Sequence, residues 1–289
     1  SEETAMIDTH QHLLYPDRFG YAWTRDLPAL QAAFRLDDYR AAAAGCNVEG
    51  AVFMEVDVDE NQSSDEARFF CELASDLSSS ILGVVAAARP EHEKFGAQLE
   101  SILHPRLKGI RRVLHTQPDD LSRAALFRRN IRRLGQFGFT FDLCVLQRQL
   151  GVALELVRDC PETTFILDHC GVPDIAGNDA ADGAGFHAWR EAIKELAREP
   201  HVHGKISGLT AYARPDQRNA AGLQPYFDTM IEAFGPGRLV WGGDWPVCNL
   251  GSGLPAWCGL SRQLLAGLSA KEQAGILAGN ARRIYSLDT

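Results

Sequence analysis

The chain has 289 residues, of which 45% are hydrophobic and 23% charged, and this composition excludes a largely disordered protein. Its 29 basic residues against 38 acidic ones leave a net charge of −9, which argues against nucleic acids and anionic membranes as partners. The sequence has neither a run long enough to span a membrane nor a signal-peptide pattern at its start, so we expect a cytoplasmic protein. The seven cysteines are scattered without a C-x-x-C pair, which favours buried thiols over disulfides or a zinc ribbon.

Short apolar segments alternate with helical patterns along the chain, and we predict these segments to be strands. They are residues 5–9, 50–56, 82–88, 107–114, 139–145, 163–167, 202–207 and 238–242. Because no linker rich in Ser, Pro or Gly divides the chain, the pattern favours one α/β domain over residues 1–289, a (β/α)8 TIM barrel. A doubly wound open sheet is the alternative.

Local signals mark where several helices begin. Ser63 with Glu66 and Ser269 with Glu272 have the spacing of a capping box, and Pro255 is suited to the first turn of a helix. Three longer connections, residues 12–36, 173–186 and 209–223, follow predicted strands. In a barrel we expect such connections on the catalytic face.

The clearest chemical signal is the segment IDTHQH at the end of the first predicted strand. His10 and His12 are two residues apart, so both imidazoles project from the same face of that strand. Two polar residues at the start of a loop are the alternative explanation. The position at the carboxyl end of a barrel strand favours function.

A second signal is RLVWGGDWP, where an apolar strand leads to Asp244 with Trp241 and Trp245 beside it. A carboxylate held against indole rings loses water, which raises its pKa or requires a partner, so Asp244 is a candidate general base. An aspartate that caps the next turn is the alternative.

A third signal is TFILDHCGVP, which ends the sixth predicted strand. Either Asp168 or His169 points into the barrel mouth, and we favour His169. Asp168 then ties down the loop or orients a histidine. A histidine of the core or surface is the alternative.

The ends of other strands supply further candidates. Glu55 lies among apolar residues and must be paired if it is buried. In KGIRRVLHTQ, either Arg111 or Arg112 can bind a carboxylate or hydroxyls through its planar guanidinium, with His115 nearby, and a surface salt bridge is the alternative for either arginine.

Two more polar residues occupy the predicted fifth and seventh strands. Asp142 lies within FTFDLCV, and GKISGLT brings the cation of Lys205 and the hydroxyl of Ser207 to the end of the seventh strand. We take Asp142 and Lys205 as candidate substrate contacts.

Five segments together resemble the amidohydrolase superfamily, and more narrowly its sugar-lactonase branch, which includes L-fuconolactonase, L-rhamnonolactonase and 2-pyrone-4,6-dicarboxylate lactonase. They are IDTHQH, ILDHCGVPD, KISGL, RLVWGGDWPV and the tail NARRIYSL. The resemblance implies a distorted (β/α)8 barrel. It also implies that the family's site positions correspond to His10, His12, His169 and Asp244 of this chain.

The sequence departs from the metal-dependent members of that superfamily. These members usually carry another histidine on the fifth strand, where this chain has Asp142, and the fourth strand offers Arg111 in place of a bridging ligand. A centre with two metal ions is therefore not expected. Either one Zn²⁺ is held by His10, His12 and Asp244, or no metal is required. The missing fifth-strand histidine favours the second alternative.

The resemblance predicts that the enzyme opens a sugar-acid (aldono) lactone. Asp244 activates a water molecule as general base, while His10, His12 and His169 polarise the carbonyl group, directly or through one metal ion. Trp241 and Trp245 are predicted to stack on the sugar ring, with Arg111 and Lys205 contacting its hydroxyls. A dicarboxylate substrate is the alternative, since these two cations can also converge on carboxylates. A metal-dependent amidohydrolase or decarboxylase and a non-catalytic ligand-binding barrel are the rival functions.

Overall fold

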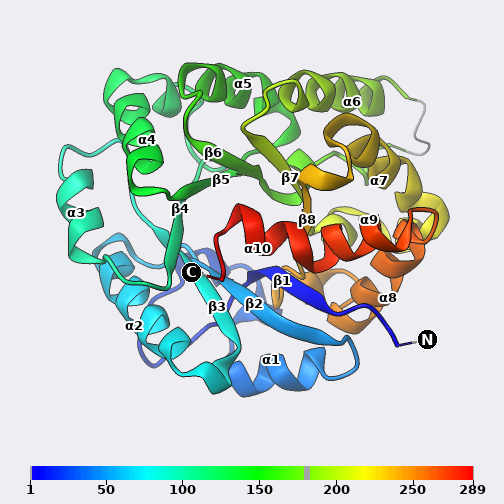
Figure 1. Cartoon of the computed structure of the whole chain (residues 1–289), viewed down its shortest axis with the longest axis horizontal. Helices are drawn as coiled ribbons and strands as arrows, with labels where there is room; N and C mark the ends of the chain where they lie inside the picture. Colours follow the sequence, from blue (N-terminus) through cyan, green and yellow to red (C-terminus); the bar gives the residue numbers. More distant parts are fainter. Residues whose placement is uncertain (1, 179–182, 289) are drawn as a thin grey trace.

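The computed structural model describes residues 2–178 and 183–288, and within them eight parallel strands follow one another in chain order. They are β1 (Met6–Gln11), β2 (Val48–Met54), β3 (Ile81–Ala87), β4 (Leu107–Val113), β5 (Thr140–Cys144), β6 (Thr164–Leu167), β7 (Val202–Ile206) and β8 (Leu239–Trp241). Beyond the end of β8, the Asp244 amide donates to the His10 carbonyl over 2.9 Å and the His12 amide donates to the Trp245 carbonyl over 2.9 Å. These bonds bring β8 back to β1, so the sheet is a nearly closed, distorted barrel (Figure 1).

The predicted (β/α)8 barrel is confirmed, and the predicted strands lie close to the observed ones. Helices on the outside of the sheet connect successive strands, as Figure 1 shows. They are α1 (Leu36–Ala43), α2 (Ser63–Ser75), α3 (Phe95–Ser101), α4 (Ala125–Phe137), α5 (Leu150–Asp159), α6 (Ala184–Ala197) and α7 (Ala220–Phe234). After β8 follow α8 (Leu254–Leu265), α9 (Ala270–Ala274) and α10 (Asn280–Ile284). None of the described helices is both long and apolar enough to cross a membrane.

The predicted helix starts are confirmed in two places and wrong in one. Ser269 and Glu272 form the capping box of α9, and α8 has its proline in the first turn. Ser63, in contrast, already lies inside α2, because a 3-10 turn at Glu60–Gln62 leads directly into the helix. Glu66 instead accepts a hydrogen bond from the Val56 amide at the end of β2.

The three long connections follow β1, β6 and β7. The first is irregular until α1, apart from short 3-10 turns and one bridge between Leu14 and Phe34. The predicted connection 173–186 includes residues 179–182, which lie outside the described part of the chain.

The barrel interior has an apolar lower part next to the C-terminal segment. Side chains of five strands and of the C-terminal segment form one buried cluster there: Ile7, Val52, Met54, Val85, Ile166, Val240, Ala281, Tyr285 and Leu287. The Asn280 side chain donates to the Leu239 carbonyl over 2.8 Å, which attaches α10 to the start of β8. In Figure 1, α10 lies across this end of the barrel. The C-terminal segment therefore closes the end of the barrel opposite to the predicted site.

Candidate active site

The histidines of β1 lie together above the apolar layer. His10 is the last but one residue of β1 and is fully buried, and His12 directly follows the strand with 4% of its surface exposed. Their rings meet edge to face, with centroids 4.8 Å apart. The Nδ1 atom of His12 lies 3.0 Å from the Met54 carbonyl oxygen, and a carbonyl can only accept, so Nδ1 carries the proton of the neutral ring. The Nε2 lone pair of His12 then points into the site.

Asp244 lies at the centre of the imidazoles. Its Oδ1 atom is 3.4 Å from Nε2 of His12, 3.6 Å from Nε2 of His10 and 4.0 Å from Nε2 of His169. The backbone of Asp244 (φ 57°) and of His169 (φ 55°) is left-handed, a conformation that costs energy in residues other than glycine. Strain of this kind is concentrated at functional sites.

His169 is oriented from its other ring nitrogen. Its Nδ1 lies 2.7 Å from the Ser207 hydroxyl, which also accepts a hydrogen bond from the His169 backbone amide over 3.2 Å. The Tyr212 ring lies beside the imidazole, with centroids 6.1 Å apart. Ser207 thus fixes the direction in which Nε2 faces Asp244.

The surroundings lower the pKa of Asp244 and also the pKa values of His169 and His10. Burial by itself raises the pKa of Asp244, but the interaction of its carboxylate with His169 and His12 outweighs burial and holds that pKa below its usual value. Burial lowers the pKa of His169 to about 4. Burial, followed by the charge of Lys205, lowers the pKa of His10 well below its usual value. Near pH 7 the site therefore holds an aspartate carboxylate beside the neutral imidazoles of His10 and His169.

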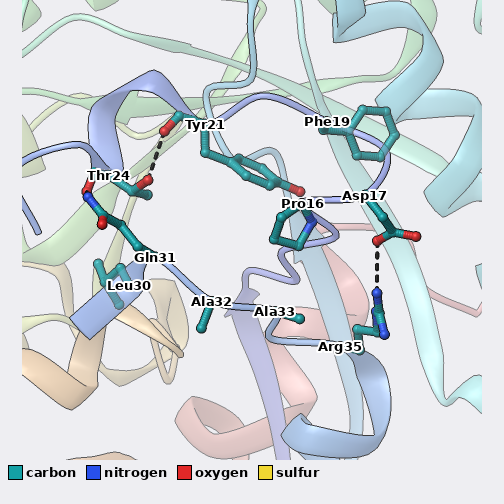
Figure 2. A pocket seen from close by; sticks show the side chains of 10 residues that line it. All are labelled: Pro16, Asp17, Phe19, Tyr21, Thr24, Leu30, Gln31, Ala32, Ala33 and Arg35. Atoms are coloured by element: carbon teal, nitrogen blue, oxygen red, sulfur yellow. Dashed lines mark hydrogen bonds and ion pairs between the residues drawn. The ribbon is translucent and has the colours of Figure 1, made fainter. Parts of the chain in front are cut away.

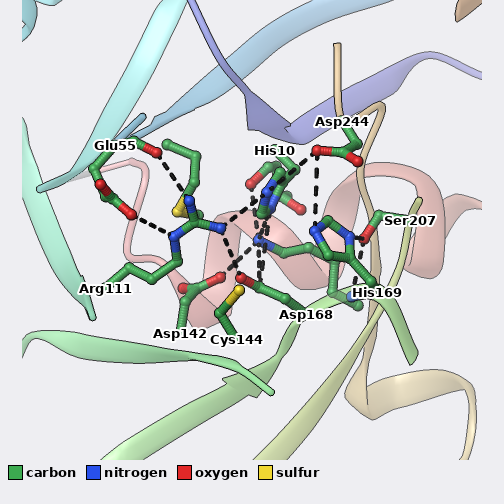
Figure 3. A network of polar contacts seen from close by, with 12 residues as sticks. His10, Glu55, Arg111, Asp142, Cys144, Asp168, His169, Ser207 and Asp244 are labelled. Carbon is green, nitrogen blue, oxygen red and sulfur yellow. Dashed lines mark hydrogen bonds and ion pairs between the residues drawn. The ribbon is translucent and has the colours of Figure 1, made fainter. Parts of the chain in front are cut away.

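A charged network lies directly beneath the histidines, as Figure 3 shows. Arg111 on β4 donates through Nε to Glu55 over 2.7 Å, and its Nη1 lies 3.4 Å from an oxygen of Asp168. The Lys205 ammonium on β7 lies 2.8 Å from Asp142 and 3.4 Å from Asp168. Each of these five residues has 5% or less of its surface exposed. Both cations are therefore paired inside the barrel, as buried charges require.

Burial of so many carboxylates raises the pKa of one of them. Asp142 has a pKa well above its usual value because of burial and the nearby charge of Asp168, although Lys205 acts in the opposite direction. The hydroxyl of Tyr285 donates to both oxygens of Asp142, over 3.0 and 3.2 Å. Asp142 thus lies below the histidines, between the network and the C-terminal segment.

His115 lies at the rim and contacts Cys144. The distance from Nδ1 of His115 to the Cys144 sulfur is 3.2 Å. Burial lowers the pKa of His115 to about 4 and raises the pKa of Cys144 to about 12, so the pair is a neutral imidazole beside a thiol.

The two predicted tryptophans are not brought to the polar cluster. The indole nitrogen of Trp241 donates to the Ser261 hydroxyl on α8 over 2.8 Å, so this ring faces the helices. Trp245 packs edge to face against Phe34 and Tyr39, each with ring centroids 5.5 Å away. The sequence left two alternatives for the Asp244 carboxylate, a raised pKa or a partner group. The structure shows partner groups, which are the imidazoles. The predicted stacking of Trp241 on a sugar ring stays a prediction, and the structure places this ring in the outer core.

Three residues that contribute to the site received no role from the sequence. Asp8 accepts hydrogen bonds from the His10 amide (3.0 Å) and the Gly243 amide (2.7 Å), which ties β1 to the end of β8. The sequence did contain a signal for Asp8, because an aspartate within the apolar segment AMIDTH must find hydrogen-bond partners. Cys144 and Tyr285 gave no such signal, since their partners are distant in sequence.

A single divalent metal ion fits the donors that are present. Among the described residues, the buried groups His10, His12, Asp244 and His10, Asp168, His169 have the right types of ligand, with ligand atoms within 4.8 Å of one another. Oδ1 of Asp168 also lacks a hydrogen-bond partner. Even without Asp142, whose pKa is raised, the carboxylates Glu55, Asp168 and Asp244 outnumber the two paired cations, which favours a further positive charge.

The connection after β1 also forms a surface groove of about 470 Å³, shown in Figure 2. Its lining includes the Arg35–Asp17 ion pair (2.9 Å) together with Tyr21 and Leu30. None of the predicted site residues lines this groove, so it is separate from the polar cluster.

Comparison with known proteins extends over nearly the whole chain. Residues 7–287 match the model of a family described as Amidohydrolase. The L-fucono-1,5-lactonase of Burkholderia ambifaria is 30% identical over 295 residues, which cover 99% of this chain and 97% of that protein. A 2-pyrone-4,6-dicarboxylate hydrolase of Comamonas testosteroni is 28% identical over 43% of this chain and 41% of its own length.

A solved structure has the same architecture. The crystal structure of an amidohydrolase from Burkholderia multivorans with bound Zn superposes with a TM-score of 0.88 at 27% identity, covering 98% of this chain and 99% of that one. Zinc is thus found in a protein similar to this one.

Proposed function

We propose that this chain, which belongs to the amidohydrolase family and is a hydrolase, opens the lactone of a sugar acid. In the proposed reaction, water attacks the lactone carbonyl. The observation that carries the proposal is the Asp244 carboxylate, which has three imidazole Nε2 atoms within 4.0 Å. The names of the lactonase relatives support the substrate class. We also propose that residues 1–289 form one domain, since one sheet includes all eight described strands.

Asp244 is the proposed general base. Its lowered pKa keeps the carboxylate ionised near pH 7, so it can accept a proton from the attacking water. When the tetrahedral intermediate collapses, the same group can return that proton to the ring oxygen that leaves. A lactone has its leaving alkoxide in the ring, so one residue can serve both steps.

The histidines are the proposed polarising groups. His10 and His169 are neutral near pH 7, and a neutral imidazole that carries its proton on Nε2 can donate a hydrogen bond to the carbonyl oxygen. Such donors are most effective when they are fixed before the reaction, and both rings are held through Nδ1.

A bound divalent cation such as Zn²⁺ would be held by His12 and Asp244. It would supply Lewis-acid polarisation of the carbonyl and a lowered pKa for water.

The pairing of the cations favours a neutral lactone over a dicarboxylate. Arg111 already contacts Glu55 and Asp168, and Lys205 already contacts Asp142 and Asp168. An added substrate carboxylate would increase the excess of buried negative charge, whereas sugar hydroxyls can hydrogen-bond to the same side chains without adding charge.

The test is proton release from a panel of aldono-1,4-lactones and aldono-1,5-lactones plus pyrone dicarboxylate, followed with a pH indicator. Asp244→Asn and chelator-treated enzyme are measured alongside. Turnover of one neutral lactone that Asp244→Asn abolishes is the expected result. Activity on amides that requires added zinc would replace the proposal with a metal-dependent amidohydrolase. Saturable binding without turnover, retained in Asp244→Asn, would indicate a ligand-binding barrel.

A further inference from the structure

A chain of hydrogen bonds connects the C-terminal segment to His10 through the middle of the barrel. The Tyr285 hydroxyl donates to Asp142 over 3.0 Å, and the Lys205 ammonium donates to the same carboxylate over 2.8 Å. The ammonium also lies 3.1 Å from Nδ1 of His10. Each of these residues is buried, with 1% or less of its surface exposed. The chain of hydrogen bonds thus starts in the apolar cluster and ends at the proposed site.

The contacts of Lys205 determine where the proton of His10 lies. An ammonium group has three N–H donors and no acceptor. Its near neighbours are three acceptors, namely Asp142, the Thr9 carbonyl oxygen at 3.0 Å and Nδ1 of His10. The carboxylate of Asp168 lies 3.4 Å away as a further acceptor. The Nδ1 atom of His10 must therefore accept, and a neutral ring then carries its proton on Nε2.

The other nitrogen of His10 is compatible with this assignment. Nε2 lies 3.6 Å from the Asp244 carboxylate, which accepts, and 3.4 Å from Nη1 of Arg111, which donates. Asp244 favours a proton on Nε2 and Arg111 favours a lone pair there, and both lie farther from the ring than Lys205 does. The closer contact of Lys205 with Nδ1 therefore determines which nitrogen of His10 carries the proton.

The two histidines of β1 consequently differ. His12 carries its proton on Nδ1, facing the Met54 carbonyl, and presents a lone pair at Nε2. His10 presents an N–H at Nε2. One ring offers an acceptor or metal ligand, and the other offers a donor.

We propose that Lys205, Asp142 and Tyr285 are positioning residues that hold His10 with its proton on Nε2, so that this ring donates to the lactone carbonyl oxygen. The catalytic part of the inference rests on the proposed function, whereas the ring assignment does not. Tyr285 has two separable contributions. Its ring belongs to the apolar cluster that closes the barrel, and only its hydroxyl bonds to Asp142.

Tyr285→Phe therefore separates the hydroxyl from the packing of the ring. The matched control is Tyr226→Phe, because Tyr226 is equally a buried tyrosine but packs against Phe186 and Trp189 in the outer core. Lys205→Met removes the donor to His10 itself.

The experiment reads the ring nitrogens directly by NMR of protein with ¹⁵N-labelled histidine, and His10→Asn assigns the His10 signals by their loss. In the wild-type protein, His10 is expected to have a protonated Nε2 and His12 a protonated Nδ1. Lys205→Met is expected to lose this distinction and to lower kcat on the lactone about 100-fold. Tyr285→Phe is expected to lower kcat about fivefold, as loss of one hydrogen bond does, with KM unchanged. Tyr226→Phe is expected to match the wild-type protein.

A wild-type His10 signal with the proton on Nδ1 would overturn the inference without any variant. A Tyr285→Phe protein with wild-type kcat and spectrum would overturn the role of Tyr285. If every lactone is inert, the proposed function fails while the NMR spectrum still tests the ring assignment, so the two failures are distinguishable.

Discussion

The lower and upper parts of the barrel interior are built by the same strands but have opposite chemistry. On β6, Ile166 packs in the apolar cluster and Asp168 just beyond the strand joins the charged network. On β8, Val240 packs below, and Asp244 faces the histidines beyond the strand end. The apolar layer contributes stability by burial, whereas the buried charges of the network must be paired to be tolerated. The difference indicates that stability and chemistry are separated along the barrel axis.

The largest expected effect comes from the upper part. Asp244→Asn retains the shape of the side chain but removes the proposed base, so we expect kcat for lactone hydrolysis to fall about 1,000-fold. The melting temperature is expected to change little, since the amide can still bond to imidazoles. An Asp244→Asn enzyme with near wild-type kcat would contradict the role of Asp244 as general base. It would also contradict the separation of stability and chemistry along the barrel axis.

A substitution in the lower, apolar part should reduce the stability of the protein and leave its activity unchanged. Ile166→Ala removes buried methyl groups from the closed end of the barrel, so the free energy of unfolding is expected to fall by about 2 to 5 kcal/mol. The fraction that remains folded is expected to keep wild-type kcat and KM, measured well below the melting temperature. A large loss of kcat in the folded fraction would mean that the two parts are coupled.

Zinc binding tests the difference between His10 and His12 in the upper part of the barrel. Because His12 has a free lone pair at Nε2 and His10 does not, His12→Asn is expected to weaken zinc binding about 10- to 100-fold, as measured by calorimetry of metal-free protein. His10→Asn is expected to have a smaller effect. The exposed His92 supplies the control variant His92→Asn, which should bind zinc as the wild type does. Equal losses for the two β1 histidines would contradict the difference between them.

The smallest effect concerns pH. The histidines His10 and His169 have pKa values below their usual 6.5, about 4 for His169, so an unfolded chain binds protons below pH 6.5 that the folded protein does not. For metal-free protein, the free energy of unfolding should therefore decrease as pH falls from about 6.5 toward 4. The measurement is the free energy of unfolding of metal-free protein between pH 4 and pH 7. His10 and His169 are expected to contribute no inflection near pH 6.5 to a pH profile of kcat/KM, and an inflection that is lost in His169→Asn would contradict the lowered pKa of His169.

The fold was predictable because alternation of apolar segments and helices is a local property of the sequence. The polar residues that follow the strands could also be located, since the carboxyl ends of barrel strands converge. This explains why His10, His12, His169 and Asp244 lie together as predicted from IDTHQH, ILDHCGVPD and RLVWGGDWP.

Side-chain direction was less predictable. Trp241 lies near the same strand end as Asp244, yet its ring faces α8, because neighbouring residues of a strand point to opposite faces. The bond from Tyr285 to Asp142 joins residues 143 positions apart, and no local pattern indicates such a contact. The capping box predicted at Ser63 failed because the preceding turn continues into the helix.

Asp8 connects residues that the ribosome makes at very different times. Its carboxylate bonds to the amide of Gly243, 235 positions later in the chain, next to Asp244. While the chain grows, His10 and His12 are translated long before β8 and the base that follows it. The site is therefore incomplete until the residues that follow β8 have left the exit tunnel.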